Sequence, residues 1–332
     1  MKIVVDGFGG DNAPLSVIEG SALAVQELGV DIVITGEEKV IRQVAEQHHI
    51  SLNKIEIVNT TDVIAVCDDP TSIMKEHAQS SMAVGMKLLA DGQADAFVSA
   101  GSTGALVVGA TMIVKRIKGI KRPTIATIIP CQNGCFMLAD AGANLDCRPE
   151  MLLQFGLMGS IYMEQIINIS RPRVTLVNVG AEETKGRELQ LETYRLFQKS
   201  ALNFMGNIEA REIPLGGADV VVADGFTGNV ILKLTEGLAK FVMGGLKEMF
   251  LGSVKGKIAA SLLMKDMKQF KKKMDYKEYG GAPLLGAAKP VIKAHGSSDA
   301  YAYKNAIRQA KAFVEKDVIG TIEQAIQKSK EA

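Results

Sequence analysis

The run DVVVA at residues 219–223 is almost continuously apolar and rich in valine. Such a run is typical of a parallel strand that helices cover on both faces. Similar short runs alternate with amphipathic stretches along the chain, and this alternation predicts βαβ units. We expect strands at residues 2–6, 31–35, 54–58, 94–99, 124–129, 136–139, 173–179 and 219–223, and helices at residues 15–28, 73–89, 105–114 and 299–329. The sequence therefore predicts an α/β fold with a mainly parallel sheet.

Composition limits the classes of protein to which the chain can belong. Of its 332 residues, 47% are hydrophobic and 23% are charged, which is close to the average of globular proteins. Lys and Arg number 38 against 37 Asp and Glu, and aromatic residues make up 5%, so nucleic acid is not expected as a partner. The sequence has four scattered cysteines, no secretory signal pattern and no run of about 18 apolar residues. We expect a cytoplasmic protein without disulfides or membrane spans.

Residues 230–275 interrupt the alternation. A helix at 230–251, a turn at 252–256 and a second helix at 258–274 predict an antiparallel hairpin. Its tip is apolar, and lysines flank the tip at positions 247, 255, 257, 265, 268 and 271–273. Two interpretations fit this pattern. The hairpin is a dimerisation arm with a solvated basic face, or an interfacial anchor whose apolar groups enter lipid while its lysines meet anionic headgroups.

Ligands of open parallel sheets bind beyond the carboxyl ends of the strands, so the segments after the predicted strands are candidate sites. The segment GFGGDNAP at 7–14 has Asn12 where a dinucleotide fingerprint has its third glycine, and Asp11 and Asn12 are candidates for ligand binding or helix capping. The segment SAGSTGA at 99–105 precedes an apolar helix. Backbone amides there, with the hydroxyls of Ser102 and Thr103, form an anion site, although a capped helix start needs only one hydroxyl.

Later segments add further candidates, which are, in chain order, Asn144, Lys185, Thr227, Gly228, Asn229, His295 and Ser297. Lys185 follows a predicted strand, where a lysine neutralises a phosphate, polarises a carbonyl or remains a solvated charge. The sequence has no P-loop, no Gly-x-Ser-x-Gly elbow and no zinc-type cysteine spacing. The residues alone predict an enzyme that binds a phosphate-like anion without a metal or another cofactor.

Taken in this order along one chain, these motifs resemble those of the bacterial phosphate acyltransferases of phospholipid synthesis. The resemblance is carried by the segments at 9–14, 99–105, 142–144, 178–180, 224–230 and 293–299, and it covers nearly the whole chain. The chain departs from the family in two places. The first motif more usually reads DAMGGD where this chain has Gly7 and Phe8, and the anion loop usually carries Asn at the position of Ser102.

The resemblance implies a three-layer α/β/α fold similar to those of isopropylmalate dehydrogenases and phosphotransacetylases. Residues 1–332 would form one catalytic unit, or two closely packed subdomains, in a homodimer. The implied reaction forms acyl phosphate from long-chain acyl-acyl carrier protein and inorganic phosphate. A membrane glycerol-3-phosphate acyltransferase would use the product, so the enzyme is expected in the cytoplasm or peripherally at the inner face of the membrane. The acidic carrier protein is expected to dock on a basic surface. The lysines at 265–277 are one candidate, which competes with the interpretation that the same residues contact the membrane.

For this reaction, we expect phosphate to be held by Gly101, Ser102, Thr103 and Gly104, with Lys185 offsetting its charge. Phosphate attacks the thioester directly, Asn229 and the backbone near Gly228 stabilise the oxyanion, and His295 protonates the thiolate or orients phosphate. The expected substrate contacts are Asp11, Asn12, Asn144, Thr227, Gly228 and Ser297. Two alternatives remain, namely a phosphotransacetylase-like enzyme that uses acyl-coenzyme A and a non-enzymatic module that binds carrier protein or lipid. A nicotinamide-dependent dehydrogenase is weaker still, because Asn12 breaks the fingerprint.

Overall fold

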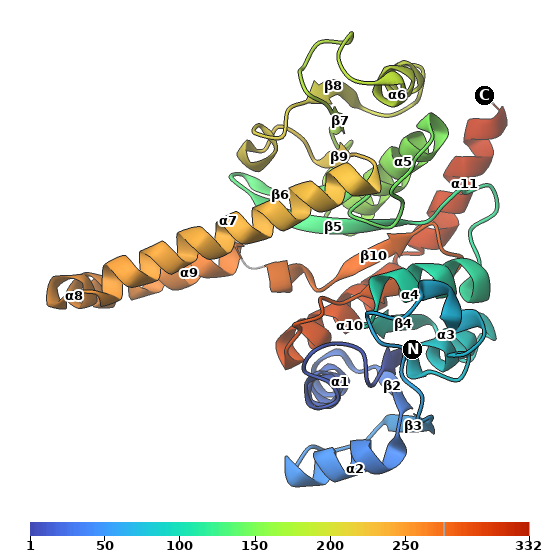
Figure 1. Ribbon diagram of the computed structural model, residues 1–332, viewed down its shortest axis with the longest axis vertical. Coiled ribbons are helices and arrows are strands. Elements are labelled where there is room, and N and C mark those ends of the chain that lie inside the picture. Colours follow the sequence, from blue (N-terminus) through green and yellow to red (C-terminus); the bar gives the residue numbers. More distant parts are fainter. Residues whose placement is uncertain (275, 332) are drawn as a thin grey trace.

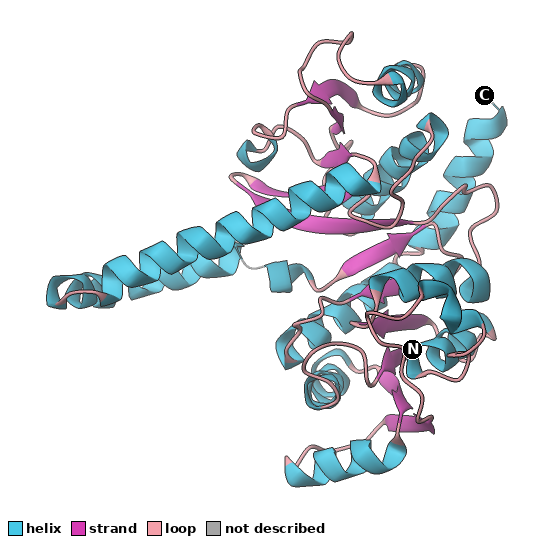
Figure 2. Ribbon diagram, viewed as in Figure 1, coloured by secondary structure: helices cyan, strands magenta, loops and turns pink. Residues whose placement is uncertain are grey.

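The computed structural model describes the backbone of residues 1–274 and 276–331, and the side chains of residues 1–270 and 278–328. Within this part of the chain, eleven strands form one sheet (Figures 1 and 2). From one edge to the other they are β3 (Ile55–Asn59), β2 (Asp31–Gly36), β1 (Lys2–Asp6), β4 (Ala96–Ser99), β11 (Val291–Lys293), β10 (Ala282–Leu285), β5 (Thr124–Cys131), β6 (Gly134–Ala139), β9 (Val220–Val222), β7 (Val174–Val177) and β8 (Phe204–Ile208).

Two parallel halves make up this sheet, and antiparallel strands join them. The first half runs from β3 to β11 and the second from β6 to β8, with parallel pairing throughout each half. Strand β10 links the halves, because Ala282 and Pro283 pair with β11 while Leu284 and Leu285 pair with β5. The mainly parallel sheet that the sequence predicts is therefore confirmed.

Helices cover both faces of the sheet, which gives three layers. On the first half, α1 (Leu15–Leu28) and α10 (Ala300–Glu315) pack on one face, and α3 (Ser81–Ala90) and α4 (Thr103–Gly109) on the other. On the second half, α5 (Pro149–Gln165) and α11 (Val318–Glu331) pack opposite the start of α7 (Gly225–Leu251). The remaining elements are α2 (Glu38–Gln47), α6 (Glu188–Gln198), the π-helical turn η2 (Ala110–Val114), and the short helices η1 (Pro70–Met74), η3 (Ile213–Leu215) and η4 (Tyr276–Tyr279).

Several predicted boundaries were wrong. The helix expected at 73–89 is divided into η1 and α3, and the hydroxyl of Ser80 starts α3 by accepting from the N–H of Ala83 at 3.3 Å. The helix expected at 299–329 is divided into α10 and α11 at Asp317, which has a φ of 45°. Strands β8, β10 and β11 were not predicted, since each is only three to five residues long and β10 contains a proline.

The predicted hairpin projects from the body as an arm of three helices, seen in orange in Figure 1. Helix α7 begins five residues earlier than expected because Asp224 caps it, accepting from the N–H of Thr227 at 2.9 Å. The returning half of the arm consists of two helices, α8 (Val254–Leu262) and α9 (Met264–Met274). The predicted lysine side chains at 271–273 and residue 275 lie outside the described residues. Among the described helices, none combines the length and the apolar character needed to cross a membrane.

Candidate active site

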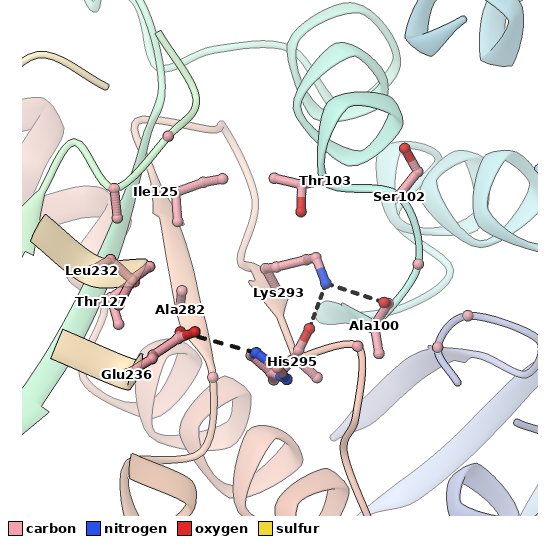
Figure 3. Close-up of a pocket in the computed structure, with 18 of the residues that line it drawn as sticks. Ala100, Ser102, Thr103, Ile125, Thr127, Leu232, Glu236, Ala282, Lys293 and His295 are labelled. Carbon is pink, nitrogen blue, oxygen red and sulfur yellow. Dashed lines mark hydrogen bonds and ion pairs between the residues drawn. The ribbon is translucent and has the colours of Figure 1, made fainter. Parts of the chain in front are cut away.

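A cavity of about 700 Å³ lies where the two halves of the sheet meet (Figure 3). The loops that follow β1, β4 and β11 line it at the carboxyl ends of these parallel strands. Its other walls come from β5, the first turns of α7, the segment at 63–66 and the segment at 279–282. This is the edge of the sheet at which the sequence places ligands.

Close contact between two backbones shapes the floor of the cavity. A Cβ on residue 9 would lie 2.6 Å from the amide nitrogen of Gly101, so only glycine fits at position 9. The loop after β4 is anchored by Ser99, whose hydroxyl donates to Asp6 at 2.7 Å and accepts from the N–H of Gly101 at 3.0 Å. Asp6 is fully buried, and burial raises its pKa, although the hydroxyls of Ser81 and Ser99 oppose this.

The predicted anion loop lies at the start of α4 and lines the cavity with Gly101, Ser102 and Thr103. Ser102 is 4% exposed and caps the helix, since its hydroxyl accepts from the N–H of Ala105 at 3.4 Å. The Thr103 hydroxyl turns toward Lys293 and the centre of the cavity, whereas that of Ser102 turns away from it (Figure 3). Thr103 is therefore the hydroxyl of the pair that is placed to contact a ligand.

Lys293, the last residue of β11, points into the cavity opposite this loop (Figure 3). Its ammonium donates to the carbonyl oxygens of Ala100 at 3.1 Å and Ala294 at 2.5 Å. Burial lowers the pKa of Lys293 to about 8, while the carboxylate of Asp6 acts in the opposite direction. Sequence reasoning gave this residue no role, because the strand that positions it was not predicted.

His295 lies two residues further on and faces α7. Its Nδ1 accepts from the backbone N–H of Ser297 at 3.2 Å, so the neutral ring carries its proton on Nε2. Nε2 lies 4.0 Å from the carboxylate of Glu236, which also pairs with Lys233 at 2.9 Å. Burial lowers the pKa of His295, with a smaller opposing effect from Glu236. The ring thus presents an N–H donor at the cavity wall.

The structure brings Asp11, Asn229 and His295 together with the anion loop around the cavity. Other predicted substrate contacts instead hold the loops in place. Asn12 donates to the carbonyl oxygen of Ser298 at 3.2 Å, which joins the loops after β1 and β11. Ser297 supplies the backbone N–H that fixes the ring of His295.

Three more of the predicted residues stabilise the start of α7 and the loop beside it. The Asn144 amide donates to the carbonyl oxygen of Pro123 at 2.8 Å and to Asp140 at 2.9 Å. The Thr227 hydroxyl donates to Asp224 at 2.8 Å. A Cβ on residue 228 would overlap the carbonyl oxygen of Asp140, so glycine is required there for α7 to approach the loop after β6.

Lys185 lies outside this constellation. It is exposed in the loop between β7 and α6 and is not among the residues that line the cavity. The strand order explains its position, because β6 and β9 separate β7 from β5. In the described part of the chain, no three His, Cys, Asp or Glu side chains cluster in a way that could hold a metal ion.

The architecture is shared with phosphotransacetylases of known structure. A phosphotransacetylase from Streptococcus pyogenes superposes with a TM-score of 0.63 at 20% identity, covering 98% of this chain and 94% of that one. EutD phosphotransacetylase from Staphylococcus aureus superposes with a TM-score of 0.62 at 16% identity, over 98% and 94% of the two chains. The protein thus has the α/β/α fold of the phosphotransacetylases, as expected.

Sequence comparison identifies the family. The family described as "Fatty acid synthesis protein" matches residues 1–321. Phosphate acyltransferase from Alkaliphilus oremlandii is 48% identical over 326 residues, which are 98% of this chain and 97% of the relative. That from Clostridioides difficile is 46% identical over 332 residues, or 100% and 98% of the two chains. The chain belongs to the phosphate acyltransferase family, and the predicted enzyme class is confirmed.

Proposed function

We propose that the chain transfers the acyl group of long-chain acyl-acyl carrier protein to inorganic phosphate and so supplies acyl phosphate for phospholipid synthesis. The observation that carries the proposal is the two-ended cavity, in which the Lys293 ammonium and the start of α4 face an apolar wall from β5 and α7. One end suits an anion and the other suits a hydrocarbon chain. The similarity to phosphate acyltransferases supports the same reaction.

Phosphate in this proposal lies between Lys293 and the loop at 101–104. The first amides of a helix have no acceptor within the helix, so those at the start of α4 donate to phosphate together with the Thr103 hydroxyl. Lys293 takes the charge-neutralising role that the sequence analysis gave to Lys185, whose own role stays an untested prediction.

A phosphate oxygen forms a bond to the thioester carbonyl carbon, and the carbon–sulfur bond breaks with its electron pair leaving on sulfur. Asn229, which lines the cavity from α7, donates its amide to the oxyanion. Burial lowers the pKa of His295, which favours the neutral ring. In this proposal the ring turns its Nε2–H from Glu236 toward phosphate and orients it. A thiolate whose conjugate acid has a pKa of about 8.5 leaves without an acid, so catalysis rests on positioning and electrostatics.

The test is thiol release from long-chain acyl-acyl carrier protein, with and without phosphate, and in parallel from acyl-coenzyme A. We expect release that depends on phosphate and prefers the carrier protein. Lys293→Ala should raise the KM for phosphate about tenfold or more, the loss of one charge-assisted contact. Lys289→Ala is the matched control, because Lys289 is exposed and lies outside the cavity lining. Release without phosphate would refute the reaction, and a preference for acyl-coenzyme A would change the donor.

The arm supports the expected partners. Exposed apolar side chains along α7, at Phe226, Leu234 and Phe241, suit a homodimer contact. At the tip, Ile258 and Leu262 are 59% and 81% exposed and suit peripheral contact with the inner face of the membrane, beside the glycerol-3-phosphate acyltransferase that uses the product.

These two contacts are separable by mutation. Ile258→Glu with Leu262→Glu should abolish co-sedimentation with anionic vesicles, and Leu234→Glu should shift the sedimentation coefficient toward that of a monomer. Charge reversal at Lys265 and Lys268 should raise the KM for acyl carrier protein but leave that for acyl-coenzyme A unchanged. Each contact is refuted if its own variant behaves as the wild type.

A further inference from the structure

The wall opposite Lys293 has an apolar lining that one strand and one helix build together. On β5, Ile125, Thr127 and Ile129 alternate along the strand and so point to the same face. Ile125 and Ile129 are each only 5% exposed. In Figure 3, Ile125, Thr127 and Leu232 lie on one side of the Lys293 ammonium, and the anion loop lies on the other. The apolar surface therefore begins directly beside the polar end.

Helix α7 extends the lining away from Lys293, with apolar side chains at Leu232 and Ala239 and polar ones at Asn229 and Glu236. Asn229, Leu232, Glu236 and Ala239 line the cavity and lie at i, i+3, i+7 and i+10, which places them along one face of the helix. From the first to the last of them the helix rises about 15 Å, at 1.5 Å per residue. Ala239 is the last residue of α7 in the lining, and the next large side chain on this face is that of Met243. The lining on α7 therefore ends at a residue whose side chain is a single methyl group, about one turn before the longer side chain of Met243.

The other apolar wall is a poor place for a hydrocarbon. The segment at 63–66 also lines the cavity, and its Ile64 is 6% exposed, but Val66 is 81% exposed and Val63 is 40% exposed. A chain lying there would remain largely in water and gain little from burial. On the other side of the cavity, the β5 side chains of Ile125 and Ile129 are each only 5% exposed and offer a hydrocarbon buried apolar contacts.

We propose that an unbranched acyl chain lies in the groove between β5 and α7, with its carbonyl carbon near Lys293 and its methyl end at Ala239, and that the small side chain of Ala239 sets the longest chain that fits. This inference rests on the proposed function, since it assumes that the site takes an acyl group. It assigns a chain-length determinant to a residue that takes no part in the chemistry.

The test measures binding rather than turnover, so that it stands apart from the test of the reaction. The probes are butyl, octyl, dodecyl and hexadecyl phosphate, unreactive analogues that carry the anion and the chain in one molecule. Each methylene that enters an apolar groove should tighten the Kd about fourfold, and the gain should stop once the groove is full. The wild type should gain affinity beyond octyl phosphate.

Ala239→Phe should leave the Kd of butyl phosphate within about twofold and weaken hexadecyl phosphate more than tenfold, with Ala239→Val in between. Gly237→Phe is the matched control. It is a small-to-large change two residues away on the same helix, where an added Cβ meets no atom within 4 Å. The Kd values of this variant should depend on alkyl chain length as those of the wild type do. Thermal unfolding of each variant checks that it folds.

An unchanged affinity for hexadecyl phosphate in Ala239→Phe, or an equal loss at every length, would overturn the inference. A wild type that shows the length series but no phosphate-dependent thiol release would refute the reaction and leave the groove in place. A wild type that makes acyl phosphate but shows no length series would refute the groove alone.

Discussion

Replacing Lys293 by methionine is expected to stabilise the protein at neutral pH while it removes phosphate use. Burial lowers the pKa of this lysine from 10.5 to about 8. At about 1.4 kcal/mol per pKa unit, the charged form costs the folded state about 3 kcal/mol. Methionine would also give up hydrogen bonds to the carbonyl oxygens of Ala100 and Ala294, each contributing about 1 kcal/mol. The net gain expected for Lys293→Met is therefore about 1–2 kcal/mol at pH 7.

The lowered pKa of Lys293 also determines how the stabilisation by Lys293→Met depends on pH. The pKa of Lys293 is lower in the folded state than in the unfolded state, so its cost to stability is complete below pH values of about 8. Between pH values of about 8 and 10.5, Lys293 is neutral in the folded protein but still protonated in the unfolded chain. As pH rises through this interval, protonation stabilises the unfolded chain less and less, so the destabilising effect of Lys293 disappears. The advantage of the methionine variant should shrink over this interval.

Urea unfolding of the wild type and Lys293→Met, near pH 7 and near pH 10, measures both effects. Lys289→Met, at an exposed position, is the control for loss of one positive charge. The m values of all three proteins should agree, which shows that the denatured states are comparable. A variant that is less stable than the wild type at pH 7, or a difference that does not change with pH, would show that Lys293 is not held as a strained buried cation.

Three further predictions concern single residues. His295→Gln keeps an N–H donor and should retain most of kcat, whereas His295→Ala should lower kcat about tenfold. If both variants lower kcat equally and the wild-type rate rises toward acid pH, the ring acts as a proton donor instead. Gly228→Ala should lower the free energy of unfolding by about 1–3 kcal/mol in urea, because its Cβ meets the carbonyl oxygen of Asp140, while Gly237→Ala should not. Lys185→Ala should raise the KM for phosphate if the sequence-based role is right, and an unchanged KM would leave the charge-neutralising role to Lys293.

Local sequence signals predicted much of the fold and part of the site. Runs such as DVVVA at 219–223 identified eight of the strands, because a strand buried on both faces needs no partner to be recognised. The start of a helix near residue 103 followed from glycine and hydroxyl residues that come directly after a strand. These features depend on short-range chemistry, which a single sequence carries.

Features that depend on strand order could not be predicted in this way. Lys185 and Lys293 both end or follow a strand, and nothing near either of them says which strand lies beside the cavity. The sheet places β11 next to β4 and separates β7 from β5 by two strands, so Lys293 enters the cavity and Lys185 does not. Likewise, Asn12 and Asn144 carry the polar groups of ligand contacts, but their amides reach backbone carbonyl oxygens that lie far away in the sequence.

Two of the missed strands, β10 and β11, are also the reason that a cavity exists. Strands β1, β4 and β11 are parallel and direct their carboxyl ends to one edge of the sheet. Strand β10 runs against β11 and passes from one half of the sheet to the other, where it pairs with β5. A reversal of direction at this point separates the loops on its two sides, and ligands of open α/β sheets bind in such crevices. The same reversal sets Lys293 at one wall and the apolar face of β5 at the other, so the anion and acyl ends of the proposed site share one structural cause.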